Sequence, residues 1–241
     1  QLVVKTNSGD SVVLHVDNCY VSDLEEDNNT CYVTKYIFQK ININNYDNKF
    51  NIKCIDDITL GCDPEFFLVD KYNGKMLKAH MFFKKWGQIG SDNILAELRP
   101  KPSLTASGLT DNIYNLLCSA RTILNYNNVY DPNRIDMLAA SSYYNSSAGF
   151  HLHFGLPKGI LGKGADKMGV MCQVVKIMDY YISVPSTIIE GDTDNSRRSN
   201  IFLSYGKPSD FRLDNRTLEY RVPGGGLLKH PSITKGLIAL G

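Results

Sequence analysis

The stretch "GFHLHFG", residues 149–155, places two histidines two positions apart between aromatic and aliphatic neighbours. Polar and apolar residues alternate along it, which is typical of a β-strand with one face in the core. Side chains at positions i and i+2 of a strand point to the same face, about 6.5–7 Å apart. We therefore expect His151 and His153 to share one polar face of a sheet.

Three further segments repeat this spacing with other ionisable residues. These pairs are Asp63 and Glu65 in "CDPEFF", Glu97 and Arg99 in "AELRP", and Glu219 and Arg221 in "LEYRV". A single pair has an ordinary explanation, because any half-solvated antiparallel strand alternates polar and apolar residues. A merely wet face would also be expected to include Ser, Thr, Lys and Gln, however. If the four strands lie side by side, the four pairs merge into one patch of carboxylates, imidazoles and guanidiniums.

The chemistry of this patch indicates a cation site. Carboxylates packed together repel one another unless cations lie among them. Oxygen-rich ligation with one imidazole suits Mg²⁺ or Mn²⁺. Arg99 and Arg221 cannot bind a metal, but they can hold a phosphate group bidentately beside it. Carboxylates, a divalent cation and arginines together are the parts that phosphoryl transfer from a nucleoside triphosphate requires.

The remaining segments predict an α+β fold in two parts. Residues 1–57 are rich in Val, Tyr and Ile with Asn and Asp between them, which indicates a small N-terminal β segment. Residues 58–241 form the main domain, with a hairpin at 58–77, helices at 107–125 and 165–182, a glycine-rich loop between the histidine strand and the second helix, and a charged loop "EGDTDNSRRSN". The end, "SITKGLIALG", resembles an interrupted helix, so we expect a fragment truncated at the C-terminus.

Composition excludes several classes of partner. The chain has 241 residues, 26 basic and 25 acidic, so its net charge of +1 provides no general attraction to nucleic acid or to an anionic membrane. No apolar run approaches the roughly 20 residues of a membrane-spanning helix. The six cysteines include no CxxC pair, which favours a reducing cytoplasm over a secreted disulfide scaffold.

Five motifs in order resemble the phage amidoligase type 2 family, which contains carboxylate–amine ligases related to glutamine synthetase and glutamate–cysteine ligase. These motifs are "GCDPEFFLVD", "ELRP", "GFHLHFG", "YGKPSDFR" and "LEYRVPGGG", spanning residues 61–226. The resemblance implies a glutamine synthetase-like curved antiparallel sheet with flanking helices that binds ATP and two or more Mg²⁺ ions. It also implies a reaction in which a carboxylate is activated as an acyl phosphate and attacked by an amine, releasing ADP and phosphate. A phage-encoded protein would act in the host cytoplasm.

The resemblance also implies roles for individual residues. The metal ligands would be Glu65, Glu97 and Glu219, with Asp63 as a further ligand and His151 as the imidazole ligand. His153 would lie near the nucleotide, and Arg221 would face the transferred phosphoryl group. Arg212 and Arg197 would contact phosphates or the substrate carboxylate, although a solvated basic loop explains Arg197 and its neighbour Arg198 equally well.

Two other functions remain open at the level of sequence. A phage virion or structural protein could keep the ligase fold without turnover and use residues 1–57 for assembly. A metal-dependent hydrolase with a His-His-carboxylate centre would explain His151 and His153 but would leave Arg99 and Arg221 without a role. For a ligase, the partners would be small-molecule or peptide carboxylates and amines, whose identity the residues do not reveal. The general base and the oligomeric state are also open.

Overall fold

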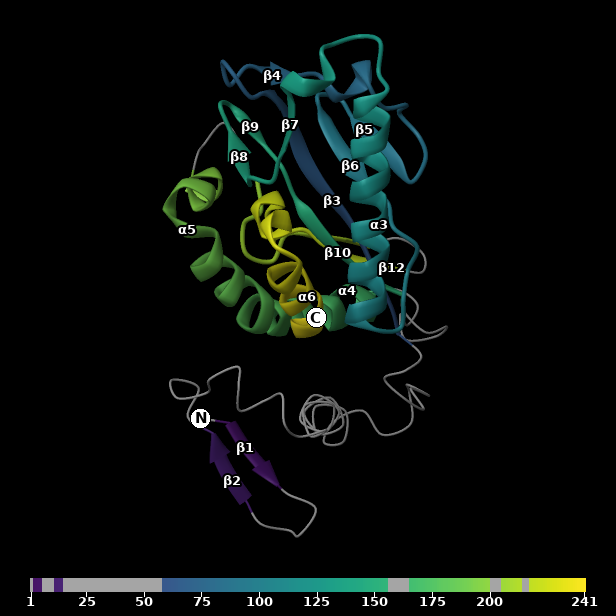
Figure 1. The fold of residues 1–241 in the computed structure, drawn as a ribbon. Helices are drawn as coiled ribbons and strands as arrows, with labels where there is room; N and C mark the ends of the chain where they lie inside the picture. The colour runs from purple at the N-terminus through teal and green to yellow at the C-terminus, as the bar shows by residue number, and fades with distance from the viewer. Residues whose placement is uncertain (1, 6–10, 15–57, 156–164, 200–204, 214–216) are drawn as a thin grey trace. The chain divides into compact units, whose positions relative to one another are not determined.

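The computed structural model describes residues 2–5, 11–14, 58–155, 165–199, 205–213 and 217–241 (Figure 1). The chain divides into two compact units, Gln1–Ile55 and Asp56–Gly241. In the first unit, strands β1 (Leu2–Lys5) and β2 (Ser11–Leu14) pair antiparallel. The rest of the expected N-terminal β segment lies outside the described residues, as does most of the expected glycine-rich loop.

The second unit is built on an eight-stranded antiparallel sheet. Its strands are β3 (Thr59–Asp70), β4 (Met76–Leu77), β5 (Ile89–Asp92), β6 (Leu95–Leu98), β7 (Ile135–Leu138), β10 (Phe150–Gly155), β11 (Phe211–Leu213) and β12 (Thr217–Tyr220). The order is β11-β12-β10-β3-β6-β5, with β4 and β7 also pairing with β3. The four strands that carry the polar pairs are therefore neighbours, as the sequence predicted. A separate small hairpin joins β8 (Ser142–Tyr143) to β9 (Ser146–Ser147).

The two faces of this sheet differ because residues alternate along each strand. On β3, Cys62, Phe66 and Leu68 belong to the main hydrophobic core. On β10, the alternating positions Phe150 and Leu152 are in the same core. The residues between them, including the polar pairs, consequently point to the opposite face. A shift of one residue in the pairing would exchange the two sets, so core burial fixes the position of the polar face.

Helix α3 (Ala106–Asn125) contributes to the core and lies alongside the sheet in Figure 1. It begins where the Thr105 side chain accepts a hydrogen bond from the backbone N–H of Gly108, which satisfies one of the free donors of the first turn. Its buried residues, Leu109, Ile113, Ala120 and Leu124, recur at helical spacing. The predicted helix at 107–125 is thus confirmed.

The expected charged loop at residues 190–199 is wrong, because this segment is helical. Helix α4 (Ala165–Met178) continues through a π-helical turn (Asp179–Ser183) into α5 (Val184–Ser199), which bends at Gly191 where φ is 73°. Glu190, Asp194 and Arg197 are buried at helical spacing. Since this buried face is charged, a search for apolar periodicity does not detect the helix.

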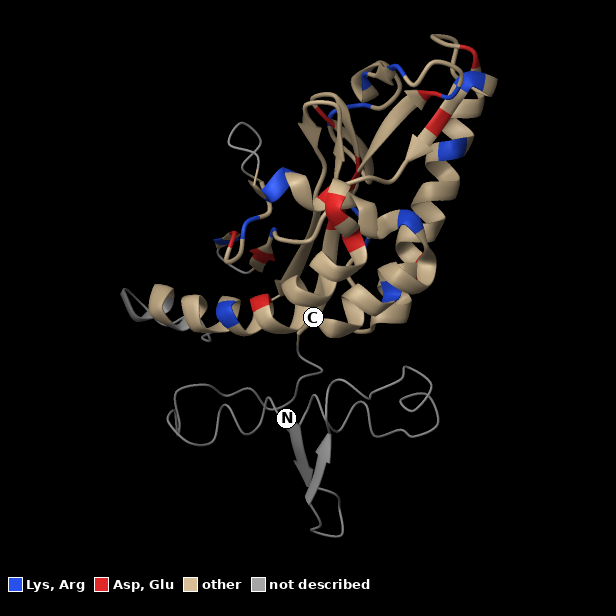
Figure 2. Ribbon diagram, turned by 90° about the vertical axis from the view of Figure 1, so that its left-hand side faces the viewer, with Lys and Arg blue, Asp and Glu red and all other residues tan. Residues whose placement is uncertain are grey.

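Helix α6 (Pro231–Leu240) covers the C-terminal segment in which the sequence indicated helical character. The His230 side chain accepts a hydrogen bond from the Ser232 backbone N–H at its start. Helix α6 packs against α3, and Leu237 and Ile238 are buried. None of the helices in the described segments has the length and apolar character needed to cross a bilayer. Basic and acidic residues are interspersed along the helices and loops in the view of Figure 2, in keeping with the near-neutral net charge.

Candidate functional site

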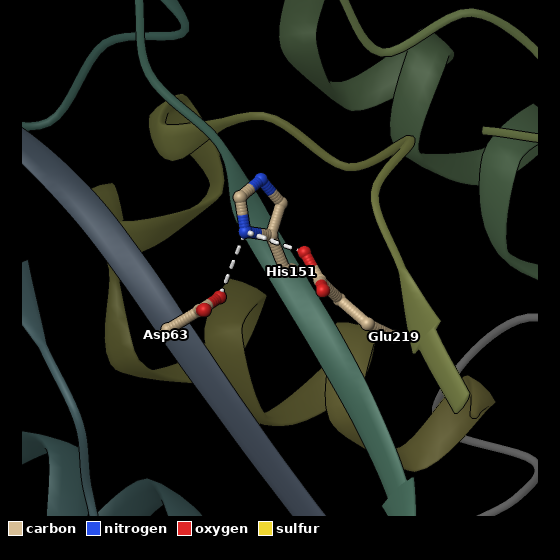
Figure 3. A group of neighbouring side chains, drawn as sticks. All are labelled: Asp63, His151 and Glu219. Carbon is tan, nitrogen blue, oxygen red and sulfur yellow. Dashed lines mark ion pairs between the residues drawn. The ribbon is translucent and has the colours of Figure 1, made fainter. Parts of the chain in front are cut away.

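The centre of the polar face is a group of three side chains from three neighbouring strands (Figure 3). His151 on β10 stands opposite Asp63 on β3, and its Nδ1 lies 2.9 Å from Oδ1 of Asp63. The same nitrogen lies 3.6 Å from Oε1 of Glu219 on β12. One potential ligand atom from each residue lies within 4.8 Å of the other two. This group is called the triad below.

The geometry of the triad fits a small divalent cation. Two ligands at right angles on Mg²⁺, each about 2.1 Å from the ion, lie about 3.0 Å apart, which is close to the 2.9 Å between Nδ1 of His151 and Oδ1 of Asp63. Oδ1 of Asp63 is buried and makes no hydrogen bond of normal geometry within the described residues, even though an imidazole is near. A buried carboxylate oxygen without a donor costs free energy, and a cation would offset that cost. The residues present therefore fit Mg²⁺ or Mn²⁺.

The pKa values of Asp63 and His151 favour the ionised form of both groups. Burial acts to raise the pKa of Asp63, but the imidazoles of His151 and His153 outweigh it and lower that pKa to about 2. Burial acts to lower the pKa of His151, but its contact with Asp63 outweighs it, and the pKa of the imidazole is raised. At neutral pH, Asp63 is therefore a carboxylate whose neighbouring imidazole binds a proton more readily than usual. A cation would replace that proton.

Glu65, two residues after Asp63 on β3, faces Glu97 on the neighbouring strand β6. Oε2 of Glu65 accepts a hydrogen bond of 2.6 Å from the Gly149 backbone N–H. Burial raises the pKa of Glu65 to about 7, and burial also raises the pKa of Glu97. Within the described segments, the only such group of three ligand atoms is the triad. The structure thus gathers three of the five expected ligands at one point and places the other two on adjoining positions.

Three of the predicted arginines surround these carboxylates. Nε of Arg221 lies 3.3 Å from Oε1 of Glu219, and Nη1 lies 3.4 Å from Oδ1 of Asp210. Arg212 stands opposite Glu219 on the edge strand β11, with its side chain 64% exposed. Arg99 pairs with the Glu97 carboxylate of its own segment and donates a hydrogen bond of 3.1 Å to the Gly87 carbonyl. All three guanidiniums therefore border the polar face.

Arg197 is placed differently from the other arginines. Its side chain is fully buried, pairs with Glu190 on the same helix, and donates a hydrogen bond of 2.8 Å to the Val222 carbonyl. Arg198 also pairs with Glu190 and is largely buried. The alternative of a solvated basic loop is wrong for both. A direct contact of Arg197 with phosphates stays a prediction, because all its observed partners belong to the protein.

A pocket of about 290 Å³ adjoins the triad on the side of His153. It is lined by residues of β3, β10 and β12 and by the segment after β6: Thr59, Gly61, Cys62, Asp63, Arg99, Pro100, Pro102, His153, Gly155 and Thr217. A Cβ atom at Gly155 would collide with the Thr59 hydroxyl oxygen, so these two lining residues are closely packed. A cationic guanidinium, an ionised carboxylate and an imidazole therefore share one pocket, which is a normal composition for a binding site.

Sequence reasoning missed two residues that contact the predicted site, Tyr205 and Asp210. Tyr205 forms a hydrogen bond with Nε2 of His151, and its ring lies under the Arg221 guanidinium. Asp210 faces the same arginine. Both residues belong to the motif "YGKPSDFR", which was noted for Arg212 alone. Membership of that motif was the available signal, since neither residue has a periodic partner.

A sheet face that concentrates carboxylates, imidazoles and guanidiniums beside a pocket is typical of enzymes that act on anionic substrates. The family model described as phage phiEco32-like COOH.NH2 ligase-type 2 matches residues 60–241, a range that contains every predicted site residue. The chain belongs to this family of carboxylate–amine ligases. The resemblance inferred from the motifs is thereby confirmed. Among curated protein sequences, none matches this chain significantly.

Proposed function

We propose that this protein is an ATP-dependent, ADP-forming carboxylate–amine ligase. It would join a small-molecule or peptide carboxylate to an amine through an acyl phosphate, on a glutamine synthetase-like sheet that binds Mg²⁺ or Mn²⁺. Membership of the ligase family supports the reaction class. The observation that carries the proposal is the adjacency of β12, β10, β3 and β6, which collects the carboxylates and arginines on one face around the triad.

The triad of Asp63, His151 and Glu219 would hold the divalent cation, with Glu65 and Glu97 as neighbouring ligands. A bound cation supplies positive charge that offsets the repulsion between the substrate carboxylate and the γ-phosphate of ATP. The low pKa of Asp63, about 2, keeps this carboxylate ionised at any physiological pH. Glu65, with a pKa of about 7, would lose its proton as a cation approaches.

In the first step, a substrate carboxylate oxygen attacks the γ-phosphorus of ATP, and the bond from that phosphorus to the β–γ bridging oxygen breaks. The products of this step are an acyl phosphate and ADP. The Arg221 guanidinium contacts both Glu219 and Asp210. These contacts would orient it towards the phosphoryl group during transfer. Arg99 and the exposed Arg212 would hold further phosphate oxygens, and His153 would lie beside the nucleotide.

In the second step, a neutral amine attacks the acyl carbon, inorganic phosphate leaves, and the nitrogen gives up a proton to form the amide. Water must be kept away from the acyl phosphate during this step. The pocket beside Asp63 and His153 offers a recess in which a substrate group would be shielded. Its mixture of a guanidinium and a carboxylate suits substrates that carry both charges, such as amino acids or peptides.

We propose the same two-part organisation for the chain that its sequence predicted. Residues 58–241 would be the catalytic domain, and residues 1–57 a small separate β segment. The protein would work in the host cytoplasm. The unpaired thiols of Cys62, Cys118 and Cys172 in the described residues support a reducing compartment.

The decisive experiment is incubation with ATP, Mg²⁺ and pooled amino acids or cell-wall peptides, followed by measurement of ADP release and product masses. The ligase predicts ADP formation that rises only when both an acid and an amine are present. Asp63→Asn should lose this activity, whereas Asp136→Asn, an exposed carboxylate on β7 of the same sheet, should keep it. Cleavage of substrate without nucleotide would support the hydrolase instead. A folded protein without any turnover would support the virion role.

A further inference from the structure

Tyr205 lies on the far side of the His151 ring from the carboxylates. Nε2 of His151 shares a hydrogen bond with the Tyr205 hydroxyl, while Nδ1 faces Asp63 and Glu219. The ring centroids of His151 and Tyr205 are 5.9 Å apart, and the ring planes are inclined by 60°. Each nitrogen of the imidazole therefore has its own partner, and these partners are on opposite sides.

The aromatic ring of Tyr205 has a second set of contacts with two guanidiniums. Cζ of Arg221 lies 5.2 Å from the ring centroid, and Cζ of Arg197 lies 5.8 Å from it. Distances below about 6 Å are those of cation–π contacts. Arg197 itself pairs with Glu190 and donates a hydrogen bond to the Val222 carbonyl, so the ring of Tyr205 contacts a buried guanidinium that has its own partners. The tyrosine thus connects the buried charges of α5 to two residues of the candidate site.

These contacts matter because an imidazole ligand needs its second nitrogen held. When one ring nitrogen binds a metal, a hydrogen bond to the other nitrogen fixes both the ring orientation and the tautomer. A hydroxyl can both donate and accept a hydrogen bond. Tyr205 can therefore donate to Nε2 when Nδ1 of His151 carries the proton, and accept from Nε2–H when Nδ1 is free to bind a cation. A flipped ring would turn a carbon atom towards Asp63 and lose both contacts.

We propose that Tyr205 is a positioning residue, whose hydroxyl holds the His151 imidazole with Nδ1 towards the cation site and whose ring supports the Arg221 guanidinium. This inference rests on the proposed function, since it assigns His151 as a cation ligand. Tyr205 acts through these two residues and contacts neither the cation nor the reacting atoms. One side chain would thus position both the imidazole ligand of the cation and the arginine that faces the transferred phosphoryl group.

The first test is Tyr205→Phe, which keeps the ring and its guanidinium contacts but removes the hydroxyl. Titration with Mn²⁺ alone, followed by electron paramagnetic resonance, should show a Kd raised about 10- to 100-fold, the usual effect of losing such a partner. The thermal unfolding midpoint should stay close to that of the unchanged protein. The matched control is Tyr143→Phe, which removes a hydroxyl that donates to the Gly74 carbonyl far from the triad, and its Mn²⁺ affinity should not change. An unchanged Kd in folded Tyr205→Phe would overturn the proposal.

The second test separates the ring from the hydroxyl. Tyr205→Leu removes both, so it should weaken Mn²⁺ binding as Tyr205→Phe does and should also raise the KM for ATP, because Arg221 loses its support. If Tyr205→Phe alone raises the KM for ATP to the same extent, the assigned role of the ring is wrong. The two variants therefore divide the proposal into two independently measurable parts.

A readout without metal keeps this inference distinct from the proposed function. In protein labelled with ¹⁵N-histidine, the ring nitrogens of His151 should report one fixed tautomer, and Tyr205→Phe should shift their signals. Failure of the unchanged protein to bind Mn²⁺ would overturn the metal site of the proposed function. In that case, the ring signals alone would test the contact between Tyr205 and His151. A shift in Tyr205→Phe would support the positioning of His151, and identical signals would overturn it.

Discussion

Asp63 contacts two histidines at once. One carboxylate oxygen lies 2.9 Å from Nδ1 of His151, and the other lies 3.2 Å from Nε2 of His153. This shared contact explains why the pKa of Asp63 falls to about 2 although its burial acts in the opposite direction. It also makes Asp63 the residue that links the two imidazoles of β10.

We expect Asp63→Asn to weaken Mn²⁺ binding at least tenfold, because it removes the central negative charge and leaves the fold intact. The pKa of His151 should fall, since Asp63 is the main group that raises it. Calorimetric titration measures the first effect, and the pH dependence of the histidine NMR signals measures the second. An unaltered His151 titration would show that the pair is not coupled as described.

The two histidines should differ in their effect on the cation. His151→Ala is predicted to weaken Mn²⁺ binding more than His153→Ala, because only His151 belongs to the triad. His153→Ala should chiefly raise the KM for ATP. Calorimetry with Mn²⁺ and steady-state kinetics with ATP distinguish these outcomes, and the reverse order of Mn²⁺ affinities would exchange the two roles.

Glu65 should make the stability of the metal-free protein depend on pH. Its folded-state pKa of about 7 lies above the ordinary value of 4.5, so the folded protein binds this proton more tightly than the unfolded chain. The resulting stabilisation is fully present below about pH 4.5 and is lost as the pH rises through 7. Glu65→Gln should therefore raise the free energy of unfolding relative to the unchanged protein at pH 8, on the order of 2 kcal/mol.

The comparison for Glu65→Gln is urea unfolding in EDTA at pH 5 and pH 8. Gln keeps an oxygen that can accept the Gly149 N–H bond, so the variant isolates the charge. The advantage of the variant at pH 8 should shrink or disappear at pH 5. An equal difference at both pH values would refute the assigned pKa. Glu65→Gln should also abolish ligase turnover.

We predict that the glycines after β12 are required because the surrounding atoms leave no space for a side chain. A Cβ atom at Gly225 would lie 2.6 Å from the Glu65 carbonyl oxygen and 3.0 Å from both the Ala140 carbonyl oxygen and the Ala148 side chain. Gly225→Ala should therefore destabilise the protein by about 1–3 kcal/mol, because backbone atoms must move. Gly236→Ala, in the open middle of α6, should be neutral or stabilising by up to about 1 kcal/mol. Chemical denaturation of both variants provides the measurement.

The buried charges of α5 are predicted to be interdependent. Glu190 pairs with Arg197 and Arg198 and accepts a 2.5 Å hydrogen bond from the Gly224 backbone N–H. Glu190→Ala would leave buried Arg197 without its counter-ion, so we expect a loss of about 3–5 kcal/mol in unfolding free energy. Asp192→Ala, at an exposed position of the same helix, should change it by less than about 0.5 kcal/mol. Similar losses in the two variants would contradict the importance of the buried pair.

The sheet could be predicted because polar and apolar residues alternate along β10, β12 and the first half of β3. The alternation of Phe150, His151, Leu152 and His153 identifies both the strand and its two faces, and the same holds for β3 and β12. The polar pairs also indicated which strands should be neighbours, and the observed order β12-β10-β3-β6 agrees. In these segments, local pattern and tertiary burial impose the same requirement on each residue.

Other features could not be predicted, because their cause lies in tertiary contacts. Helix α5 buries Glu190 and Arg197 where a pattern search expects apolar residues, and only the facing partners make this burial tolerable. The selection of Asp63, His151 and Glu219, out of the five expected ligands, as the three that meet at one point depends on strand register. The contact between Tyr205 and His151 joins two segments that share no periodicity.

The order of the strands along the chain has a consequence for biosynthesis. Asp63 lies on the first strand of the large sheet to be translated, whereas Glu219 lies on the last. A nascent chain on the ribosome therefore carries Asp63 and His151 before Glu219 has been synthesised. Capture of the proposed cation by all three groups would therefore follow the synthesis of β12. A product of premature termination before β12 would carry Asp63 and His151 without the carboxylate that completes their group.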